Sequence, residues 1–258
     1  MPTIAFDFLG TLVQFDNVIN AIWHTWEHAG LTHREDAVTL FEEWYQTSSM
    51  TYLAASHSGL YRSLLKILRG TLTSSVYKQL GRLPLEQEVE LIINTFRTDL
   101  TPSPCSLEAL QTALRNGWNV WIITQSDKMD TWNYLKKHNV ICDDHGNGSN
   151  LDDDRVWIMA CDELEVAKPH PKVYAQVMRL TVRRTQKIEN FYMVSKHAWD
   201  LEGARNISMR TVYLSQQSSL YPTEVYDGKE PDLRGESPME CVNNVLHLEQ
   251  SLKHHYLL

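Results

Sequence analysis

Short apolar runs that alternate with helix-like stretches constrain the fold of this chain more than any other feature of its sequence. The apolar runs cover residues 4–7, 119–124, 155–159, 191–195 and 211–215. Helix-like stretches separate the later runs, at residues 107–116, 128–138, 171–181 and 200–206. Strands that alternate with helices form βαβ units, in which helices cover both faces of a parallel sheet. The sequence therefore predicts an α/β fold with a Rossmann-like parallel sheet core.

A long block between the first two apolar runs lacks a clear strand. Apolar residues recur there at the spacing of one helix face. They form the sets Val18, Ile22, Trp26; Leu40, Trp44; Leu60, Leu64, Leu68; and Val89, Ile92, Ile93, Phe96. We expect this block to form an inserted α-helical cap at residues 15–98, with residues 1–14 and 99–258 forming the catalytic core.

Composition limits the kinds of partner that the chain can bind. A net charge of −8 argues against nonspecific nucleic-acid binding, which requires basic patches. No run approaches the ~18 apolar residues of a membrane span, and the N-terminus lacks the pattern of a signal peptide. The four cysteines show neither metal-site nor disulfide-framework spacing. We expect a soluble cytoplasmic protein that acts on a small molecule, and homodimer formation is left open.

Two segments predict irregular structure. Residues 142–154 are rich in Asp, Gly and Asn, which is typical of an exposed loop. Its Asp152, Asp153 and Asp154 lack the glycine and the distal glutamate of a calcium-binding loop, so we interpret them as a solvated acidic turn. Residues 216–237 are also predicted to be irregular, before a final helix near residues 238–253.

Asp7 is the first candidate for chemistry because it ends the first apolar run. Gly10 allows a sharp turn directly after it. Open α/β sheets bind their ligands at the carboxyl ends of strands, where this carboxylate is expected to lie. Leu9 stands two residues after Asp7, where an apolar side chain cannot supply a proton. We interpret Asp7 as a nucleophile whose leaving group needs no proton, against the ordinary alternative of a carboxylate that caps a turn.

Polar residues follow the later apolar runs as well. Thr124 ends the second run and offers a hydroxyl donor, with Gln125 next to it. Lys168 precedes a proline and a predicted helix. A buried ammonium near Asp7 would keep that carboxylate ionised. The ordinary alternative is that the Lys-Pro pair only begins a helix.

These motifs, in this order, resemble those of the haloacid dehalogenase superfamily and most closely its 2-haloacid dehalogenase branch. The matching residues are Asp7, Gly10, Thr11, Lys168, Pro169, Tyr174, Ser195, Ala198, Trp199, Asp200, Gly203 and Ala204. The resemblance implies a hydrolase that forms an aspartyl ester on Asp7, with Thr11 and Lys168 completing the site. It also implies that Asp200 binds Lys168 and helps to activate the water that hydrolyses the ester.

Lys196 distinguishes this chain from the magnesium phosphatases of the same superfamily. Those enzymes carry an acidic metal ligand four residues before the last aspartate, and here that position is Lys196. A cation would repel Mg²⁺, which prefers oxygen ligands. We therefore predict chemistry without a metal or another cofactor. The ordinary alternative for Lys196 is a solvated surface lysine.

His197 stands where the 2-haloacid dehalogenase branch often has asparagine. An imidazole titrates near neutral pH, so it can orient or deprotonate the hydrolytic water. We predict this role for His197, and the alternative is a structural histidine.

The substrate-facing residues implied by the resemblance come from both core and cap. They are Leu9, Tyr45, Gln46, Thr124, Gln125, Tyr174, Ser195 and Trp199. Tyr45 aligns with the halide-binding arginine of the branch, and Arg62 or Arg69 could replace that arginine. An aromatic pocket built from Trp44, Tyr45, Tyr52, Tyr61 and Trp199 would suit a bulkier or less acidic substrate than a small haloacid. The ordinary alternative is that these rings build the cap core.

Two further functions stay open at this point. A magnesium-dependent phosphatase would need the missing general acid at position 9. A non-catalytic protein, or one recruited to secondary metabolism, would retain the fold with an altered pocket. Retention of the charged set at positions 7, 168 and 200 argues against a non-catalytic protein, because buried charges are costly unless a site uses them.

Overall fold

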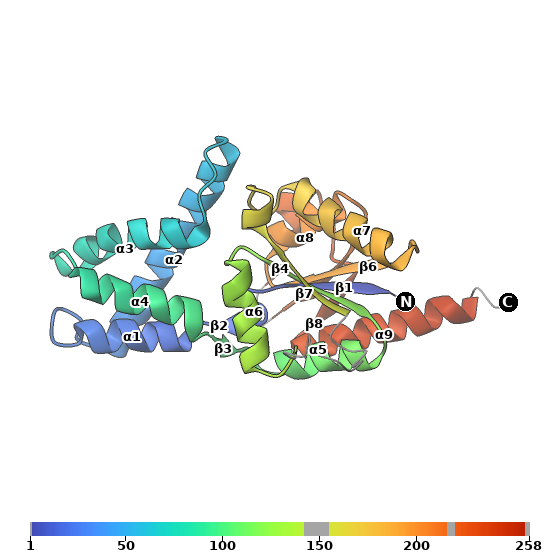
Figure 1. Cartoon of the computed structure of the whole chain (residues 1–258), viewed down its shortest axis with the longest axis horizontal. Helices are drawn as coiled ribbons and strands as arrows, with labels where there is room; N and C mark the ends of the chain where they lie inside the picture. The colour runs from blue at the N-terminus through green and yellow to red at the C-terminus, as the bar shows by residue number, and fades with distance from the viewer. Residues whose placement is uncertain (1, 142–154, 216–219, 256–258) are drawn as a thin grey trace, which may run out of the picture.

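The computed structural model describes residues 2–141, 155–215 and 220–255 (Figure 1). The predicted loop at 142–154, with its three aspartates, lies outside the described residues. Six of the described strands form one sheet with the order β5-β4-β1-β6-β7-β8. All neighbouring strands in it are parallel. The strands are β1 (Thr3–Asp7), β4 (Asn119–Thr124), β5 (Val156–Ala160), β6 (Phe191–Ser195), β7 (Arg210–Leu214) and β8 (Leu233–Gly235). The predicted α/β fold is confirmed.

Helices cover both faces of this sheet (Figure 1). They are α5 (Ser106–Arg115), α6 (Lys128–Lys137), α7 (Pro171–Thr185), α8 (Ala198–Arg205) and α9 (Pro238–His255). Side chains alternate along a strand, so Ile4 and Phe6 of β1 pack in the cluster that includes α5, α6 and α9. Ala5 packs in the other cluster, which includes α7 and α8. Because both faces are covered, the central strands β1, β4 and β6 are buried along their whole length and are apolar between their end residues.

An insertion of four helices lies beside the carboxyl edge of the sheet (Figure 1). They are α1 (Asp16–Trp26), α2 (Arg34–His57), α3 (Leu64–Leu80) and α4 (Glu86–Thr98). The predicted apolar sets lie on buried helix faces, with one exception. Leu60 is exposed and precedes α3, because the chain leaves the helix at His57 and turns. The prediction that Leu60 lies on a buried helix face is therefore wrong.

A short antiparallel ribbon joins the insertion to the core. It pairs β2 (Val13–Gln14) with β3 (Thr101–Pro102), so the chain enters and leaves the insertion through adjacent strands. Strands of two residues carry too little pattern to be predicted from sequence. We propose residues 15–98 as the limits of the cap, and this ribbon supports the proposal.

The second half of α2 contacts the core through polar pairs. Tyr61, just after α2, donates a hydrogen bond to the Asp162 carboxylate at 2.6 Å. The Ala167 backbone N–H donates to the Ser56 hydroxyl at 2.8 Å. Asp162 belongs to the short 3-10 helix η2 (Cys161–Glu163) between β5 and α7. These bonds hold one face of α2 over the carboxyl edge of the sheet.

The predicted irregular segment at 216–237 contains regular structure in its described part. A 3-10 helix, η4 (Thr223–Tyr226), precedes β8, which adds an edge strand to the sheet. Three residues ending in glycine give no alternating pattern, so this strand was missed. None of the helices in the described part of the chain combines the length and apolarity that crossing a membrane requires.

Gly203 of α8 offers a test of the packing that supports the carboxyl edge. A Cβ at this position would lie 2.7 Å from Pro169 Cβ and 2.8 Å from the Pro169 carbonyl oxygen. Gly203→Ala should therefore lower the free energy of unfolding by about 1–3 kcal/mol, as overpacking does. Gly70→Ala is the matched control, because a Cβ in this exposed part of α3 meets nothing within 4 Å. It should be neutral or stabilise by up to about 1 kcal/mol. Equilibrium urea unfolding measures both, and equal effects would contradict the packing argument.

Candidate active site

Asp7 lies at the point where the strand order reverses. β1 runs toward the cap between β4 and β6, and its last residue pairs with Ile123 of β4. Connections leave the sheet in opposite directions on the two sides of such a strand, which creates a crevice at its carboxyl end. Gly10 has a φ of 77°, a value that favours glycine, so the chain turns sharply after Asp7. The predicted placement of Asp7 at a strand end is confirmed by this geometry.

Three side chains hold the Asp7 carboxylate. The Thr11 hydroxyl donates to Oδ2 at 2.6 Å, and the Lys168 ammonium donates to Oδ1 at 2.5 Å. The Ser195 hydroxyl lies 3.5 Å from Oδ2. Asp7 is only 4% exposed, so these groups replace most of the water that a carboxylate would otherwise bind.

Lys168 connects Asp7 to a second buried carboxylate. Its ammonium also donates to Asp200 Oδ2 at 2.9 Å and approaches the Ile123 carbonyl at 3.4 Å. The other Asp200 oxygen accepts a hydrogen bond from the Tyr174 hydroxyl at 2.5 Å. Lys168 comes from the loop before α7, and Asp200 from the first turn of α8. One buried ammonium therefore joins residues from distant parts of the sequence.

The two carboxylates that share the Lys168 ammonium have pKa values that are shifted in opposite directions. Burial alone raises the pKa of the Asp7 carboxyl, but the charge of Lys168 and the hydrogen bonds from Lys168 and Thr11 help to hold that pKa below its usual value. Burial raises the pKa of Asp200 above its usual value, against the attraction of Lys168. The pKa of Lys168 itself is raised, because the two carboxylates outweigh its burial. Asp7 is thus ionised at neutral pH.

The turn from β6 into α8 and the first turn of α8 bring Lys196, His197 and Trp199 to the same cavity as Asp7. His197 Nε2 lies 3.8 Å from Asp7 Oδ2, and its ring stacks on Trp199 with 5.2 Å between centroids. Burial lowers the pKa of His197 below its usual value, so the imidazole is neutral at neutral pH. Lys196 is half-buried and lies over Gly10. Burial also lowers the pKa of Lys196, although Asp7 attracts its charge.

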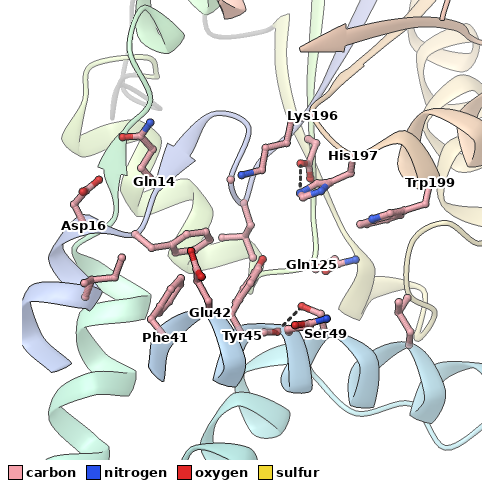
Figure 2. Close-up of a pocket in the computed structure, with 17 residues that line it drawn as sticks. Gln14, Asp16, Phe41, Glu42, Tyr45, Ser49, Gln125, Lys196, His197 and Trp199 are labelled. Carbon is pink, nitrogen blue, oxygen red and sulfur yellow. Dashed lines mark hydrogen bonds and ion pairs between the residues drawn. The ribbon is translucent and has the colours of Figure 1, made fainter. Parts of the chain in front are cut away.

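A cavity of about 540 Å³ opens above Asp7, between core and cap (Figure 2). Ligand sites in proteins typically enclose 300–1,000 Å³. Figure 2 shows Phe41, Tyr45 and Ser49 of α2 facing Lys196, His197 and Trp199 across it. The lining residues are Asp7, Leu9, Gly10, Gln14, Phe15, Asp16, Ile19, Phe41, Glu42, Tyr45, Gln46, Ser49, Leu53, Gln125, Lys196, His197 and Trp199.

Comparison with known families identifies the fold and its hydrolase class. Residues 1–207 match the family of hydrolases described as haloacid dehalogenase-like. The chain belongs to this family. Comparison with curated protein sequences found no match.

Solved structures of similar fold include dehalogenases. The L-2-haloacid dehalogenase from Xanthobacter autotrophicus is 17% identical with a TM-score of 0.72, over 94% of this chain and 97% of that one. Another dehalogenase is 21% identical with a TM-score of 0.71, over 93% and 95%. The magnesium-bound YfnB from Bacillus subtilis is 12% identical with a TM-score of 0.66, over 96% and 97%. Identities this low show the fold alone.

Five residues predicted to face the substrate of this haloacid dehalogenase-like hydrolase do line the cavity. They are Leu9, Tyr45, Gln46, Gln125 and Trp199. Tyr45 lies near Asp7, and burial raises the pKa of its phenol above the usual value. The phenol is therefore protonated at neutral pH and can donate a hydrogen bond.

Thr124, Tyr174 and Ser195 were predicted to contact the substrate, but none of them lines this cavity. Each is fully buried. The Thr124 hydroxyl accepts a hydrogen bond from the Ser126 backbone N–H at 2.9 Å, and the Ser195 hydroxyl accepts one from the His197 N–H at 3.1 Å. Tyr174 donates to Asp200. Thr124 and Ser195 therefore stabilise the turns that follow their strands, because strand-end hydroxyls can bond to the following backbone. Tyr174 instead holds the Asp200 carboxylate.

The predicted aromatic pocket is smaller than the sequence suggested. Trp44 is fully buried in the cap, where its Nε1–H donates to the Leu68 carbonyl at 3.0 Å. The hydroxyls of Tyr52 and Tyr61 are hydrogen-bonded to each other at 2.9 Å, and Tyr61 also donates to the Asp162 carboxylate. These three rings are part of the cap core and its contact with the rest of the protein.

Neither arginine considered as a replacement for the halide-binding residue reaches the cavity. Arg69 forms ion pairs with Glu86 and Glu90 on the cap surface. Arg62 is exposed and donates to the carbonyl of its neighbour Tyr61 at 2.7 Å.

Sequence reasoning missed most of the cap wall and one core residue. On α2 the lining residues Phe41, Tyr45, Ser49 and Leu53 follow the four-residue spacing of one helix face, a signal that was available. Phe15 begins the cap and packs on Phe41, with 5.0 Å between ring centroids. The sequence indicates Lys196 only as the replacement of a metal ligand or as a surface lysine, whereas in the structure it lines the cavity.

The residues of the site do not fit a magnesium ion. Oxygens of Asp7 and Asp200 already share the Lys168 ammonium, and the other Asp200 oxygen is bonded to Tyr174. Lys196 occupies the side of the carboxylate nearest the turn at Gly10. Among the described residues, no group of three His, Cys, Asp or Glu side chains assembles that could hold a metal. Mg²⁺ requires several oxygen ligands in octahedral geometry, and here oxygens of both carboxylates are already bonded to Lys168, Thr11 or Tyr174.

Proposed function

We propose that this haloacid dehalogenase-like hydrolase attacks a small organic substrate through Asp7 and forms an aspartyl ester without a metal. The observation that carries the proposal is the state of Asp7. Its carboxylate is ionised, held by Thr11 and Lys168, and lines a cavity large enough for a ligand. A deprotonated, oriented carboxylate with little water around it is an activated nucleophile.

The first step displaces the leaving group. An Asp7 oxygen forms a bond to the substrate carbon while the carbon–halogen bond breaks and its electron pair departs with the halide. Leu9 lines the cavity next to the nucleophile and has no proton to give. A leaving group that is stable as an anion suits this environment, whereas an alkoxide does not. We therefore favour a carbon–halide or a related carbon electrophile over a phosphate ester.

The departing group is proposed to lie toward the cap. In-line displacement places it opposite the attacking oxygen, and Asp7 attacks from the floor of the cavity. Tyr45 lies on the cap wall and has a protonated phenol that can donate to a departing halide. It would take the part that an arginine plays in the 2-haloacid dehalogenase branch. A neutral donor stabilises a halide less than a guanidinium does.

Hydrolysis of the ester completes the cycle. Water attacks the Asp7 carbonyl carbon and gives one proton to His197. The ester C–O bond then breaks, and the departing alkoxide takes that proton from His197 and leaves as the alcohol. The remaining proton of the attacking water passes to solvent, which restores the Asp7 carboxylate. His197 suits this role because its Nε2 faces Asp7 at 3.8 Å and its lowered pKa keeps it able to accept a proton. We propose that Asp200 and Tyr174 act indirectly, by holding Lys168.

The cavity favours a substrate bulkier than a two- or three-carbon haloacid. Its volume is about 540 Å³, and the rings of Phe15, Phe41, Tyr45 and Trp199 form much of its wall. Apolar substituents on the substrate would bury surface against these rings, at about 25 cal/mol for each Å² removed from water.

Asp7→Asn should abolish turnover and leave the fold intact, because an amide cannot form the ester. In a single turnover in ¹⁸O-water, the wild-type product should contain ¹⁶O from Asp7. Product labelled wholly from solvent would exclude the covalent route. Asp16→Asn is the matched control, because Asp16 also lines the cavity but is exposed at its rim. That variant should keep activity within a few-fold.

Activity should survive dialysis against EDTA, and added Mg²⁺ should not raise it. The physical reason is that Lys168 and Lys196 hold positive charge where a metal would compete for Asp7. Turnover of haloacids and phosphate esters is measured before and after chelation. Loss of activity that Mg²⁺ restores would support the phosphatase alternative instead.

His197→Ala should keep the burst of released halide and slow steady-state turnover by about 10²–10⁴-fold, the usual effect of a positioned base. The ester on Asp7 should accumulate and be visible by intact-mass spectrometry. In the wild type, steady-state turnover should fall as pH drops through a value below the usual histidine pKa of 6.5, because protonated imidazole cannot accept a proton. His197→Ala should lack this dependence, and His197→Asn should recover much of the rate. Normal turnover by His197→Ala would make the residue structural.

A further inference from the structure

A second opening between cap and core adjoins the cavity above Asp7. It is a cleft of about 640 Å³ between the end of α2 and the loop before α7. Leu53 lines both spaces, so the cavity and the cleft meet at this side chain. The cleft also reaches Lys168, whose ammonium bonds to Asp7. The cleft therefore comes within one side chain of the nucleophile.

Helix α2 forms one wall along both spaces. Figure 2 shows Phe41, Tyr45 and Ser49 in that order along the helix, and Leu53 continues their spacing of four residues. His57 follows four residues later on the same helix face and lines the cleft. Because a helix rises about 1.5 Å per residue, this wall continues for about 6 Å beyond Leu53. A molecule held at Asp7 can therefore extend along α2 from the cavity into the cleft.

The side chains that line the cleft suit an apolar chain. The apolar ones are Leu53, Ala54, Val166, Ala167 and Pro169. Two exposed histidines, His57 and His170, also line it. Among the described residues of its lining, none carries a carboxylate, and the ammonium of Lys168 is already bonded to two carboxylates. A ligand in the cleft therefore gains most by removing apolar surface from water.

Hydrogen bonds hold the two walls of the cleft together. The Ala167 backbone N–H of the core donates to the Ser56 hydroxyl of α2 at 2.8 Å, and both residues line the cleft. Tyr61 of the cap donates to Asp162 of the core at 2.6 Å. These bonds are present while the cap covers Asp7. The cleft therefore exists without any change in the position of the cap.

We propose that the cleft binds an unbranched apolar chain of the substrate, which extends past Leu53 from the attacked carbon, and that it makes the enzyme selective for long-chain substrates. This inference rests on the proposed function and names the shape of its substrate. Burial of one methylene group strengthens binding by up to about fourfold. Two or three methylene groups in the cleft would therefore favour a long substrate by about 10–100-fold.

The test compares 2-bromodecanoate with 2-bromohexanoate, which share the leaving group and differ in chain length. The wild type should have the higher kcat/KM for the decanoate. Ala54→Trp fills the cleft, because Ala54 lines it and does not line the cavity. This variant should lower the ratio of decanoate to hexanoate kcat/KM by about 10–100-fold and keep turnover of the hexanoate, which also shows that it folds.

Thr51→Trp is the matched control, because Thr51 is an exposed residue of α2 that lines neither space. It should leave the ratio unchanged. An unchanged ratio in Ala54→Trp would overturn the proposal, as would an equal fall in Thr51→Trp. Equal slowing of both substrates by Ala54→Trp would also overturn it, because a cleft that only carries water or halide would serve every chain length alike.

A binding measurement separates this inference from the proposed reaction. In the Asp7→Asn background, calorimetry follows binding of both bromoacids without turnover. Adding Ala54→Trp should weaken binding of the decanoate by about 10–100-fold and leave that of the hexanoate within a few-fold. If the wild type converts neither substrate, the proposed function fails, and this binding result alone decides the role of the cleft. Absent binding of the decanoate, or binding that Ala54→Trp leaves unchanged, overturns the proposal.

Discussion

The ammonium of Lys168 is the interaction on which the site depends. It is 1% exposed and bonds to two carboxylates that come from β1 and α8. Removing one partner from such a buried set typically costs about 3–5 kcal/mol, because the remaining charges are left without compensation. The ammonium therefore fixes the loop before α7 and the start of α8 against the end of β1. It also keeps Asp7 ionised, so the group that stabilises the fold at this edge is the one that prepares the nucleophile.

The other residues of the site fall into two groups, those that hold neighbouring groups in place and those that reach the cavity. Tyr174 and Ser195 are fully buried and hold other groups, whereas Asp7, His197 and Lys196 reach the cavity. This division follows from the fold. Tyr174 and Ser195 are enclosed by the sheet and its helices, whereas Asp7 at the end of β1 and the residues that follow β6 lie at the carboxyl edge, where ligands bind in such folds. The cap closes that edge with one face of α2, whose contacts with the core fix which of its side chains face the nucleophile.

The sequence alone predicts the parallel sheet and the carboxylate of Asp7 at a strand end, because periodicity and chain order are sufficient for both. Asn119–Thr124 and Phe191–Ser195 agree with the predicted strands at both ends. The sequence does not predict the direction in which each side chain points, because that direction depends on tertiary packing. A strand-end Thr124 can bond to its own backbone or face the cavity, and the sequence is the same in both cases. Lys196 gives no pattern at all, and its direction becomes defined only where the turn at Gly10 leaves room for it.

The two lysines near Asp7 supply the positive charge of the proposed metal-free site. Lys168 bonds to both Asp7 and Asp200, and Lys196 adds a second positive charge beside Asp7. When Asp7 becomes an ester its charge is lost and the halide carries a negative charge away, so Lys168 keeps only Asp200 as a charged partner. Uncompensated charge is costly in a buried site, so hydrolysis of the ester, which restores the Asp7 carboxylate, also restores the charge balance of the site. The same argument explains why an acid at position 9 would be harmful, because it would add a further negative charge beside the nucleophile.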